Sequence, residues 1–280
     1  MSAQLGLGQS NSSLELILRD GLAFVRKSSQ NPTRLRKQYE KHLKLESRLY
    51  PLHAPKVVTA FDGNSYEMEF VHGTPFGFAL KRLTLNQVKT VADILSEFFE
   101  GILDVSKGEP SESLRLSRKI QSFSSNQSVL EFQFGEKSVE LLSKHVAELQ
   151  ILSGLNHGDF SFDNTLIQFN SGPIKVFTLD FLDSPFESPL IDLGRFWLDL
   201  EYGWWDFDNN KSATWSLNNR IIRSEVMRVA HRHGVSTSTV EYFALFACVR
   251  IIPYLKDPHR ILFIQSAIKN LVVRSSEWQF

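Results

Sequence analysis

The chain has 280 residues, and hydrophobic side chains make up 42% of them. A chain of this length and composition can bury the core of one two-lobed unit or of two close domains. Lysine plus arginine and aspartate plus glutamate each number 31, so no overall charge favours nucleic acid or an anionic membrane as a partner. The single cysteine, Cys248, excludes an intramolecular disulfide.

No signal peptide pattern precedes the first predicted strand, and the longest apolar run, residues 242–249, is too short to span a bilayer. The sequence therefore predicts a cytoplasmic protein with no membrane span.

Residues 14–71 predict a small region rich in β-strands. Asp20-Gly21 is a pair that favours a tight hairpin turn, and Asn31-Pro32 marks the start of a helix that continues to about Leu49. The predicted strands cover residues 14–18, 22–27, 57–61 and 66–71.

Beyond Thr84 the hydrophobic period becomes helical. Thr84 and Gln87 predict a capping box at the start of a long helix. Residues 106–128 are rich in serine and charge and are expected to form a mobile insertion. A second hairpin is predicted from residues 166–169 and 174–179, and helices are expected after it.

The second hairpin lies between polar residues in an informative pattern. His157, Asp159 and Asn164 have the spacing H-x-D-x-x-x-x-N, and Asp180 ends the following apolar strand. Phosphoryl transfer from Mg-ATP needs a carboxylate for the acceptor's hydroxyl proton, and an amide and a second carboxylate to hold metal. We therefore interpret Asp159 as the catalytic base and Asn164 and Asp180 as ligands of Mg²⁺.

The pattern His157-Gly158-Asp159 resembles the catalytic loop of the aminoglycoside phosphotransferase and choline kinase family, in which glycine stands where protein kinases usually carry arginine. The resemblance runs from about residue 8 to residue 200. It implies an α+β, two-lobed protein-kinase-like fold with a β-rich N-lobe and a mainly helical C-lobe. The lobes are expected at residues 1–72, binding nucleotide, and 73–280, carrying the catalytic and acceptor-binding groups.

The resemblance also implies roles in nucleotide binding. Lys27 occupies the place of the family's phosphate-binding lysine, with Arg26 as the alternative because strand alternation points only one of them into the cleft. Glu40 fits the glutamate that pairs with this lysine, and Glu46 is the alternative. The hinge that would meet adenine is expected at Glu69, Phe70 and Val71, and the phosphate loop at Gly6, Gly8 and Ser10.

Two further residues are expected to support the catalytic loop. By the resemblance, His157 holds the loop through hydrogen bonds, and Asp192 braces it without touching substrate. The segment between Asp180 and Asp192 is too short for the activation segment of a protein kinase, and the A-P-E motif is absent. The expected substrate is therefore a small molecule.

The acceptor pocket is expected after Asp192. Trp204 and Trp205 offer aromatic faces, and Asp199 and Glu201 offer carboxylates, which suit a sugar, an amino sugar or choline. Residues 180–190 also resemble bacterial phosphotransferases found with cell-surface polysaccharide genes, which implies a sugar or related polar metabolite.

The sequence thus predicts an enzyme with ATP and Mg²⁺ as cofactors that phosphorylates a hydroxyl of a small molecule. The alternative is a nucleotide-binding regulatory protein that keeps this fold without the reaction.

Overall fold

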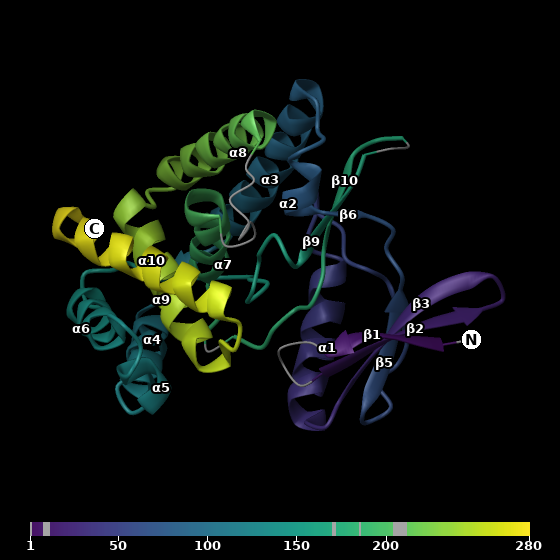
Figure 1. Cartoon of the computed structure of the whole chain (residues 1–280), viewed down its shortest axis with the longest axis horizontal. Coiled ribbons are helices and arrows are strands. Elements are labelled where there is room, and N and C mark those ends of the chain that lie inside the picture. The colour runs from purple at the N-terminus through teal and green to yellow at the C-terminus, as the bar shows by residue number, and fades with distance from the viewer. Residues whose placement is uncertain (1, 8–11, 170–171, 185, 204–211) are drawn as a thin grey trace.

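The computed structural model describes residues 2–7, 12–169, 172–184, 186–203 and 212–280 (Figure 1). The strands are β1 (Ser2–Leu7), β2 (Ser12–Arg19), β3 (Leu22–Ser29), β4 (Val57–Thr59), β5 (Ser65–Glu69), β6 (Thr74–Pro75), β7 (Lys107–Gly108), β8 (Leu152–Ser153), β9 (Thr165–Gln168) and β10 (Lys175–Thr178). The α-helices are α1 (Pro32–Glu46), α2 (Phe76–Ala79), α3 (Leu85–Asp104), α4 (Pro110–Phe123), α5 (Gln127–Leu130), α6 (Gly135–His145), α7 (Pro189–Trp197), α8 (Ala213–Arg232), α9 (Thr237–Ile251) and α10 (Pro258–Arg274). Single turns of other helix types follow some of them: η1 (Leu198–Tyr202), η2 (Ile252–Tyr254) and η3 (Ser275–Glu277).

The N-terminal part is an antiparallel sheet with the strand order β1-β2-β3-β5-β4, and α1 packs against β3 and β5. The hairpin of β2 and β3 turns at Asp20-Gly21, where both residues have positive φ (53° and 76°). A two-residue turn with positive φ at both positions matches the right-handed twist of the strands, and Asp-Gly adopts it readily. The predicted hairpin is therefore confirmed.

Helix α1 begins where the sequence predicted. The Asn31 side chain accepts a hydrogen bond from the backbone N–H of Arg34 at 3.0 Å, and Pro32 takes the first helical position. The helix buries a face that is half polar, made of Leu35, Gln38, Lys41, His42 and Leu45. That face points at the C-lobe and the sheet, so its polar members reach the site described below.

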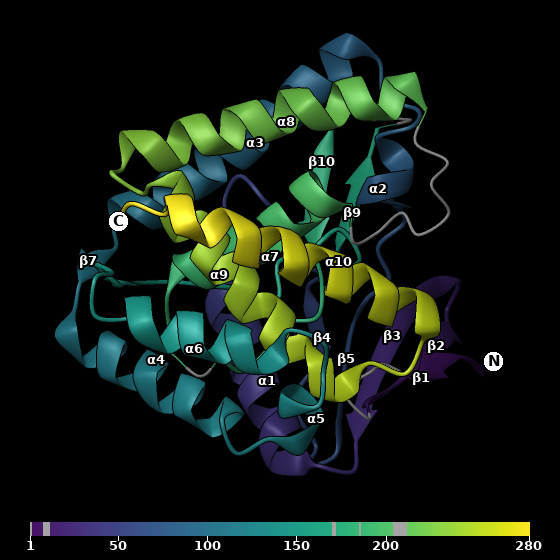
Figure 2. The same ribbon diagram turned by 60° about the vertical axis from the view of Figure 1, so that its left-hand side comes forward.

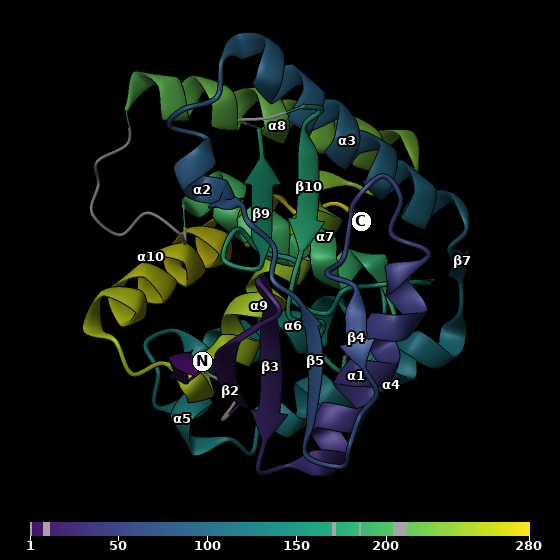
Figure 3. The ribbon, with the colours of Figure 1, turned by 90° about the vertical axis from the view of Figure 1, so that its right-hand side faces the viewer.

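Between β5 and β6 the chain crosses from the first sheet to a second one with the strand order β10-β9-β6, which Figure 3 shows above β3 and β5. The predicted lobe boundary at residues 72 and 73 falls in this connection. Helices then form the bulk of the C-lobe, in which α3 packs on α8 and α7 packs on α9 (Figure 2). The result is the two-lobed α+β fold that the sequence predicted.

Residues 106–128, expected as a mobile insertion, contain the packed helix α4. Leu116, Ile120 and Phe123 are buried in the hydrophobic core of the C-lobe. These residues recur at helical spacing, and the serine and charged residues between them cover the solvent-facing side. The mobile insertion was predicted from composition alone, and for residues 110–123 the structure has a packed helix instead.

No single helix in the described residues is long and apolar enough to cross a membrane; α8 and α9 with η2 pass that test only together, across a bend of 114°.

Candidate active site

The loop that carries Asp159 is held by backbone hydrogen bonds to a buried carboxylate. Asp192, on α7, accepts from the backbone N–H of His157 and, at 2.8 Å, from that of Gly158. Gly158 has a φ of 92°, and a Cβ there would lie 2.5 Å from the carbonyl oxygen of Leu182. Only glycine fits this turn without strain, which explains the glycine of the His-Gly-Asp motif.

His157 is placed to support the loop and not to move protons. Its Nε2 donates to the carbonyl of Leu179 at 2.7 Å, and its Nδ1 accepts from the backbone N–H of Asp159 at 3.3 Å. Burial lowers the pKa of His157 to about 4, so the ring is neutral near pH 7. These contacts hold the loop in place, and the structural role of His157 stays a prediction.

Asp159 and Asn164 lie in contact, although a turn separates them in the chain. The Asn164 amide donates to the Asp159 carboxylate at 3.0 Å and to its backbone carbonyl at 2.9 Å. The backbone N–H of Leu179 donates to the carbonyl of Asn164 at 2.8 Å, which places Asp180 beside them. The three residues that the spacing singled out are therefore together at one end of β9 and β10.

Two arginines that we did not predict flank Asp159. Arg195 of α7 and Arg250 of α9 donate to one oxygen of this carboxylate at 3.1 and 3.4 Å, and Arg250 also donates to the Gly158 carbonyl at 2.9 Å. Burial raises the pKa of Asp159, but the two guanidinium groups outweigh it and leave that pKa below its usual range. A sequence signal existed for Arg250, because it directly follows the apolar run of residues 242–249.

Lys27, in place of its alternative Arg26, points toward the catalytic loop. Its side chain is 3% exposed and forms an ion pair with Asp180. Arg26 projects from the other face of the sheet and pairs with Glu67 at 2.8 Å. Asp180 is 41% exposed and has a φ of 57°, a left-handed conformation that turns its carboxylate out of the strand toward the lysine. The pair joins the N-lobe to the catalytic end of the C-lobe.

The prediction that Glu40 pairs with Lys27 is wrong. Glu40 lies on the exposed face of α1, where it lines a cavity of 300 Å³ with Lys37 and Lys41. The error is one of helical phase, because the buried face of α1 carries Gln38 and His42 and not Glu40, and His42 is the residue of this face whose pKa the charge of Lys27 lowers. The alternative, Glu46, accepts instead from the backbone N–H of Val57 at 3.4 Å.

The predicted hinge residues begin at Glu69, the last residue of β5, and continue into the crossing between the two sheets. The backbone N–H of Glu69 donates to the Lys56 carbonyl at 2.9 Å, and that of Phe70 donates to the Ala23 carbonyl at 3.2 Å. Val71 comes next in the connection, and its contact with adenine stays a prediction. Ser10, predicted in the phosphate loop, lies outside the described residues.

Of the acceptor residues predicted after Asp192, the two that the structure describes, Asp199 and Glu201, are not brought together. Asp199 is fully buried, where it accepts from the backbone N–H of Phe162 at 2.8 Å and from Arg195 at 3.2 Å. It therefore braces the catalytic loop and has no surface for an acceptor. Glu201 faces away from that loop and pairs with Arg223 and Arg274. Trp204 and Trp205 lie outside the described residues.

The donors at the site suit a hard metal ion. In the described part of the chain no three His, Cys, Asp or Glu residues cluster as metal ligands. The oxygen atoms of Asn164 and Asp180 could bind Mg²⁺, which takes few protein ligands and completes its shell with water and phosphate.

No family model and no curated protein sequence matches this chain, and the similar proteins that comparison finds are solved structures. A thermostable variant of aminoglycoside phosphotransferase APH(4)-Ia, in ternary complex with ADP and hygromycin B, matches with a TM-score of 0.64 and 13% identity, over 100% of this chain and 95% of that chain. Choline kinase LicA from Streptococcus pneumoniae matches with a TM-score of 0.61 and 15% identity, over 98% and 94%. Plasmodium vivax ethanolamine kinase matches with a TM-score of 0.55 and 11% identity, over 96% and 82%. At these identities the likeness establishes the fold, which is the fold that the sequence motif predicted.

Proposed function

We propose that this protein is an ATP-dependent phosphotransferase that acts on a hydroxyl group of a small molecule. The observation that carries the proposal is the contact between Asp159 and Asn164 directly beside the Lys27–Asp180 ion pair. A base, an amide, a second carboxylate and a cation thus meet at one point between the lobes. The structural neighbours support it, since their names describe small-molecule kinases and some hold ADP or ATP.

In this mechanism Asp159 accepts or orients the proton of the acceptor hydroxyl. Its depressed pKa keeps it ionised at neutral pH, and the Asn164 amide fixes one of its oxygens. Lys27 neutralises phosphate charge, and Asp180 must release it to do so. Asn164 and Asp180 would hold Mg²⁺, which when bound supplies charge neutralisation on the transferred phosphate.

For the acceptor, we propose a sugar or related polar metabolite, in a reaction that belongs to cell-surface polysaccharide synthesis and takes place in the cytoplasm. The support is the resemblance of residues 180–190 to bacterial phosphotransferases found with cell-surface polysaccharide genes. An amino sugar and choline are the competing acceptors. A screen that follows ADP release across sugars, amino sugars and choline separates them.

The test of the reaction is Asp159→Asn. Loss of the base should lower turnover by about 10²–10⁴-fold and leave the affinity for ATP within a few-fold of the parent. Glu40→Gln is the matched control, because that carboxylate lies on the exposed face of α1 and should leave turnover unchanged. Equal turnover in the Asp159 variant and the parent would reject the assignment.

The competing function is a nucleotide-binding regulatory protein without phosphotransfer. A binding module has no need of a base that contacts the metal-binding amide, so the Asp159–Asn164 contact argues against it. Stabilisation by Mg-ATP together with no ADP release from any acceptor in the screen would favour this function.

A further inference from the structure

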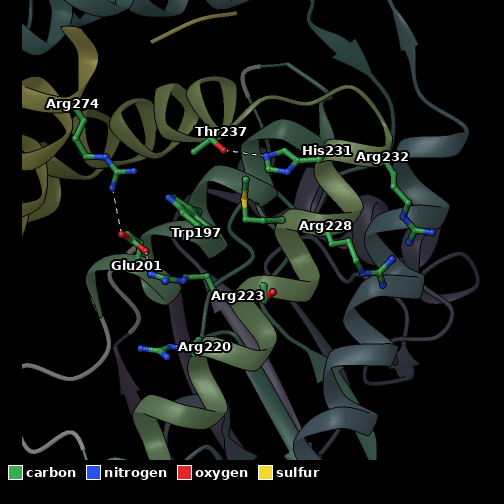
Figure 4. A pocket seen from close by; sticks show the side chains of 11 residues that line it. Trp197, Glu201, Arg220, Arg223, Arg228, His231, Arg232, Thr237 and Arg274 are labelled. Carbon is green, nitrogen blue, oxygen red and sulfur yellow. Dashed lines mark hydrogen bonds and ion pairs between the residues drawn. The ribbon is translucent and has the colours of Figure 1, made fainter. Parts of the chain in front are cut away.

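A cavity of 780 Å³ lies in the C-lobe between η1, α8 and the C-terminal end of α10. Figure 4 shows arginines around it from two helices, and Trp197 and Glu201 on one wall. Its volume is in the range of pockets that hold small organic ligands. The lining residues are Trp197, Glu201, Arg220, Arg223, Ser224, Met227, Arg228, His231, Arg232, Thr237 and Arg274.

This cavity is separate from the proposed phosphotransfer site. Helix α9 touches both places: Arg250 near its end contacts Asp159, while Thr237 at its start lines the cavity. At about 1.5 Å of rise per residue these two positions are roughly 20 Å apart along the helix. Figure 2 shows the same separation, with the ends of α8 and α10 that form the cavity on the side of the C-lobe away from the N-terminal sheet.

The two sites also lie on opposite faces of one element. Arg195 and Asp199 point from α7 and η1 to the catalytic loop, as their contacts with Asp159 and Phe162 establish. Trp197 and Glu201 are offset from them by half a helical turn and therefore point the other way, into the cavity.

The charge of the lining is strongly positive. Five arginines face the cavity against one carboxylate, Glu201, which Arg223 and Arg274 share. Arg228 and Arg232 have partners outside the lining, Glu225 at 2.6 Å and Glu100 at 2.8 Å. Arg220 pairs with no carboxylate in the described part of the chain. A guanidinium group left free beside four others is a site for an anion, above all a phosphate.

An unsatisfied donor in the wall points to a ligand independently. Trp197 is 5% exposed, and its indole N–H is buried without a hydrogen-bond partner among the described residues. An unpaired buried donor is costly, and an oxygen of a ligand in the cavity would satisfy it. The apolar faces of Trp197 and Met227 would meet the organic part of the same molecule.

We propose that this cavity is a second ligand site, which binds a small phosphate ester between Arg220 and Arg223 of α8 and Trp197 of α7. The proposal does not depend on the reaction proposed above, because nothing in the argument uses Asp159 or ATP.

The experiment titrates the full-length protein, labelled with ¹⁵N in its tryptophans, with inorganic phosphate and then with ribose 5-phosphate. The indole signal of Trp197, identified by its loss in Trp197→Phe, should move saturably, and the ester should bind more tightly than phosphate. Arg220→Glu should weaken binding about tenfold or more, because a charge-assisted hydrogen bond becomes a repulsion. Arg220 is exposed on α8, so this variant should fold normally.

Two controls separate the site from general charge and from the nucleotide site. Arg118→Glu changes an exposed arginine of α4 outside the cavity and should leave the titration unchanged. Lys27→Ala removes the proposed phosphate contact of the nucleotide site and should also leave it unchanged. The proposal is overturned if the Trp197 signal does not move, or if it moves equally in Arg220→Glu. Vesicles that contain phosphatidic acid are titrated in parallel. The proposal is overturned too if these vesicles move the Trp197 signal and the two soluble phosphates do not.

Discussion

The charge around Asp159 sets its proton affinity. A general base works best when it is ionised at the working pH, and a buried carboxylate alone would tend to take up a proton. Arg195 and Arg250 reverse that tendency through contacts of 3.1 and 3.4 Å. Both come from helices far from the Asp159 loop in the chain, so the fold and not the motif determines the pKa of this proposed base.

We expect Arg250→Gln to raise the pKa of Asp159, because one of the two neighbouring positive charges is lost while Arg195 remains. The acid limb of the pH profile of kcat/KM should therefore move to higher pH, with activity lost earlier as pH falls. Arg250→Lys keeps the charge and should move the limb less. An acid limb at the same pH in Arg250→Gln and the parent would contradict this account of the base.

His42 makes a second residue-level prediction, on stability. Burial on α1 lowers the pKa of His42 to about 4, and its Nε2 donates to the Pro55 carbonyl at 2.7 Å. The unfolded chain binds a proton on this ring below pH 6.5 and the folded chain does not, so the contribution of His42 to stability falls as pH falls from about 7 to 4. Glutamine has no ionisable side chain, so the stability of His42→Gln lacks this contribution to its pH dependence.

The free energies of unfolding of the parent and His42→Gln should therefore converge by roughly 2 kcal/mol between pH 7 and pH 5. Urea unfolding at both pH values measures this difference of differences, in which the other titrating groups cancel. A gap that does not change with pH would mean that folded His42 takes up its proton normally.

At the scale of elements, the sequence predicted what depends on local spacing. The Asp20-Gly21 turn, the Asn31-Pro32 helix start and the capping box of Thr84 with Gln87 all form as expected, because each involves residues a few positions apart. The phase of α1 was not predictable in this way. Whether Glu40 or His42 faces Lys27 depends on how the helix packs on the sheet, and apolar spacing along α1 is weak because its buried face is half polar.

The dependence on packing also explains why the sequence did not place the predicted acceptor residues Asp199 and Glu201 correctly. Asp199 and Glu201 are two positions apart, so on a helix they face nearly opposite directions, and sequence alone did not indicate which face meets the catalytic loop. In the structure, Asp199 accepts a hydrogen bond from the loop at Phe162, and Glu201 lines the arginine-lined cavity. A ligand in that cavity would therefore touch the element whose other face positions Asp159.

The capping box gives a prediction at this scale. The Thr84 side chain accepts from the backbone N–H of Gln87, and the Gln87 side chain accepts from that of Thr84 at 2.9 Å. Thr84→Ala should lower the free energy of unfolding by about 1 kcal/mol. Thr90→Ala, at an exposed position inside the same helix, is the matched control and should be neutral or slightly stabilising. Equal effects of the two changes in denaturant unfolding would show that the cap does not stabilise α3.

In the whole molecule, polar contacts join the two lobes. The backbone of His53 exchanges hydrogen bonds with β10, at 2.9 Å to the Val176 carbonyl and 2.8 Å from the Thr178 N–H. The buried Lys41 of α1 donates to Asn156 at 2.7 Å, directly before the catalytic loop. The Lys27–Asp180 ion pair completes the set. The contacts of His53 and Lys41 can persist during turnover. The Lys27–Asp180 ion pair, in contrast, occupies both side chains that Mg-ATP would require.

The last prediction concerns the competition between the Lys27–Asp180 ion pair and Mg-ATP for the same two side chains. Before nucleotide binds, Lys27 neutralises Asp180; with Mg-ATP, each should turn to a phosphate oxygen or to the metal. Lys27→Met keeps the length of the side chain and removes the charge, so ATP should bind about tenfold more weakly through loss of one charge-assisted contact. At an ATP concentration a hundred times the parent's Kd, stabilisation should fall from about 2.7 to about 1.4 kcal/mol. Thermal unfolding with and without Mg-ATP measures this stabilisation as the increase in Tm that Mg-ATP causes in each variant.

The control is Lys37→Met, which removes the exposed pair with Asp183 near the same junction and should keep the full ATP-dependent increase in Tm. If both variants gained as much from Mg-ATP as the parent, Lys27 would not be the lysine that binds phosphate.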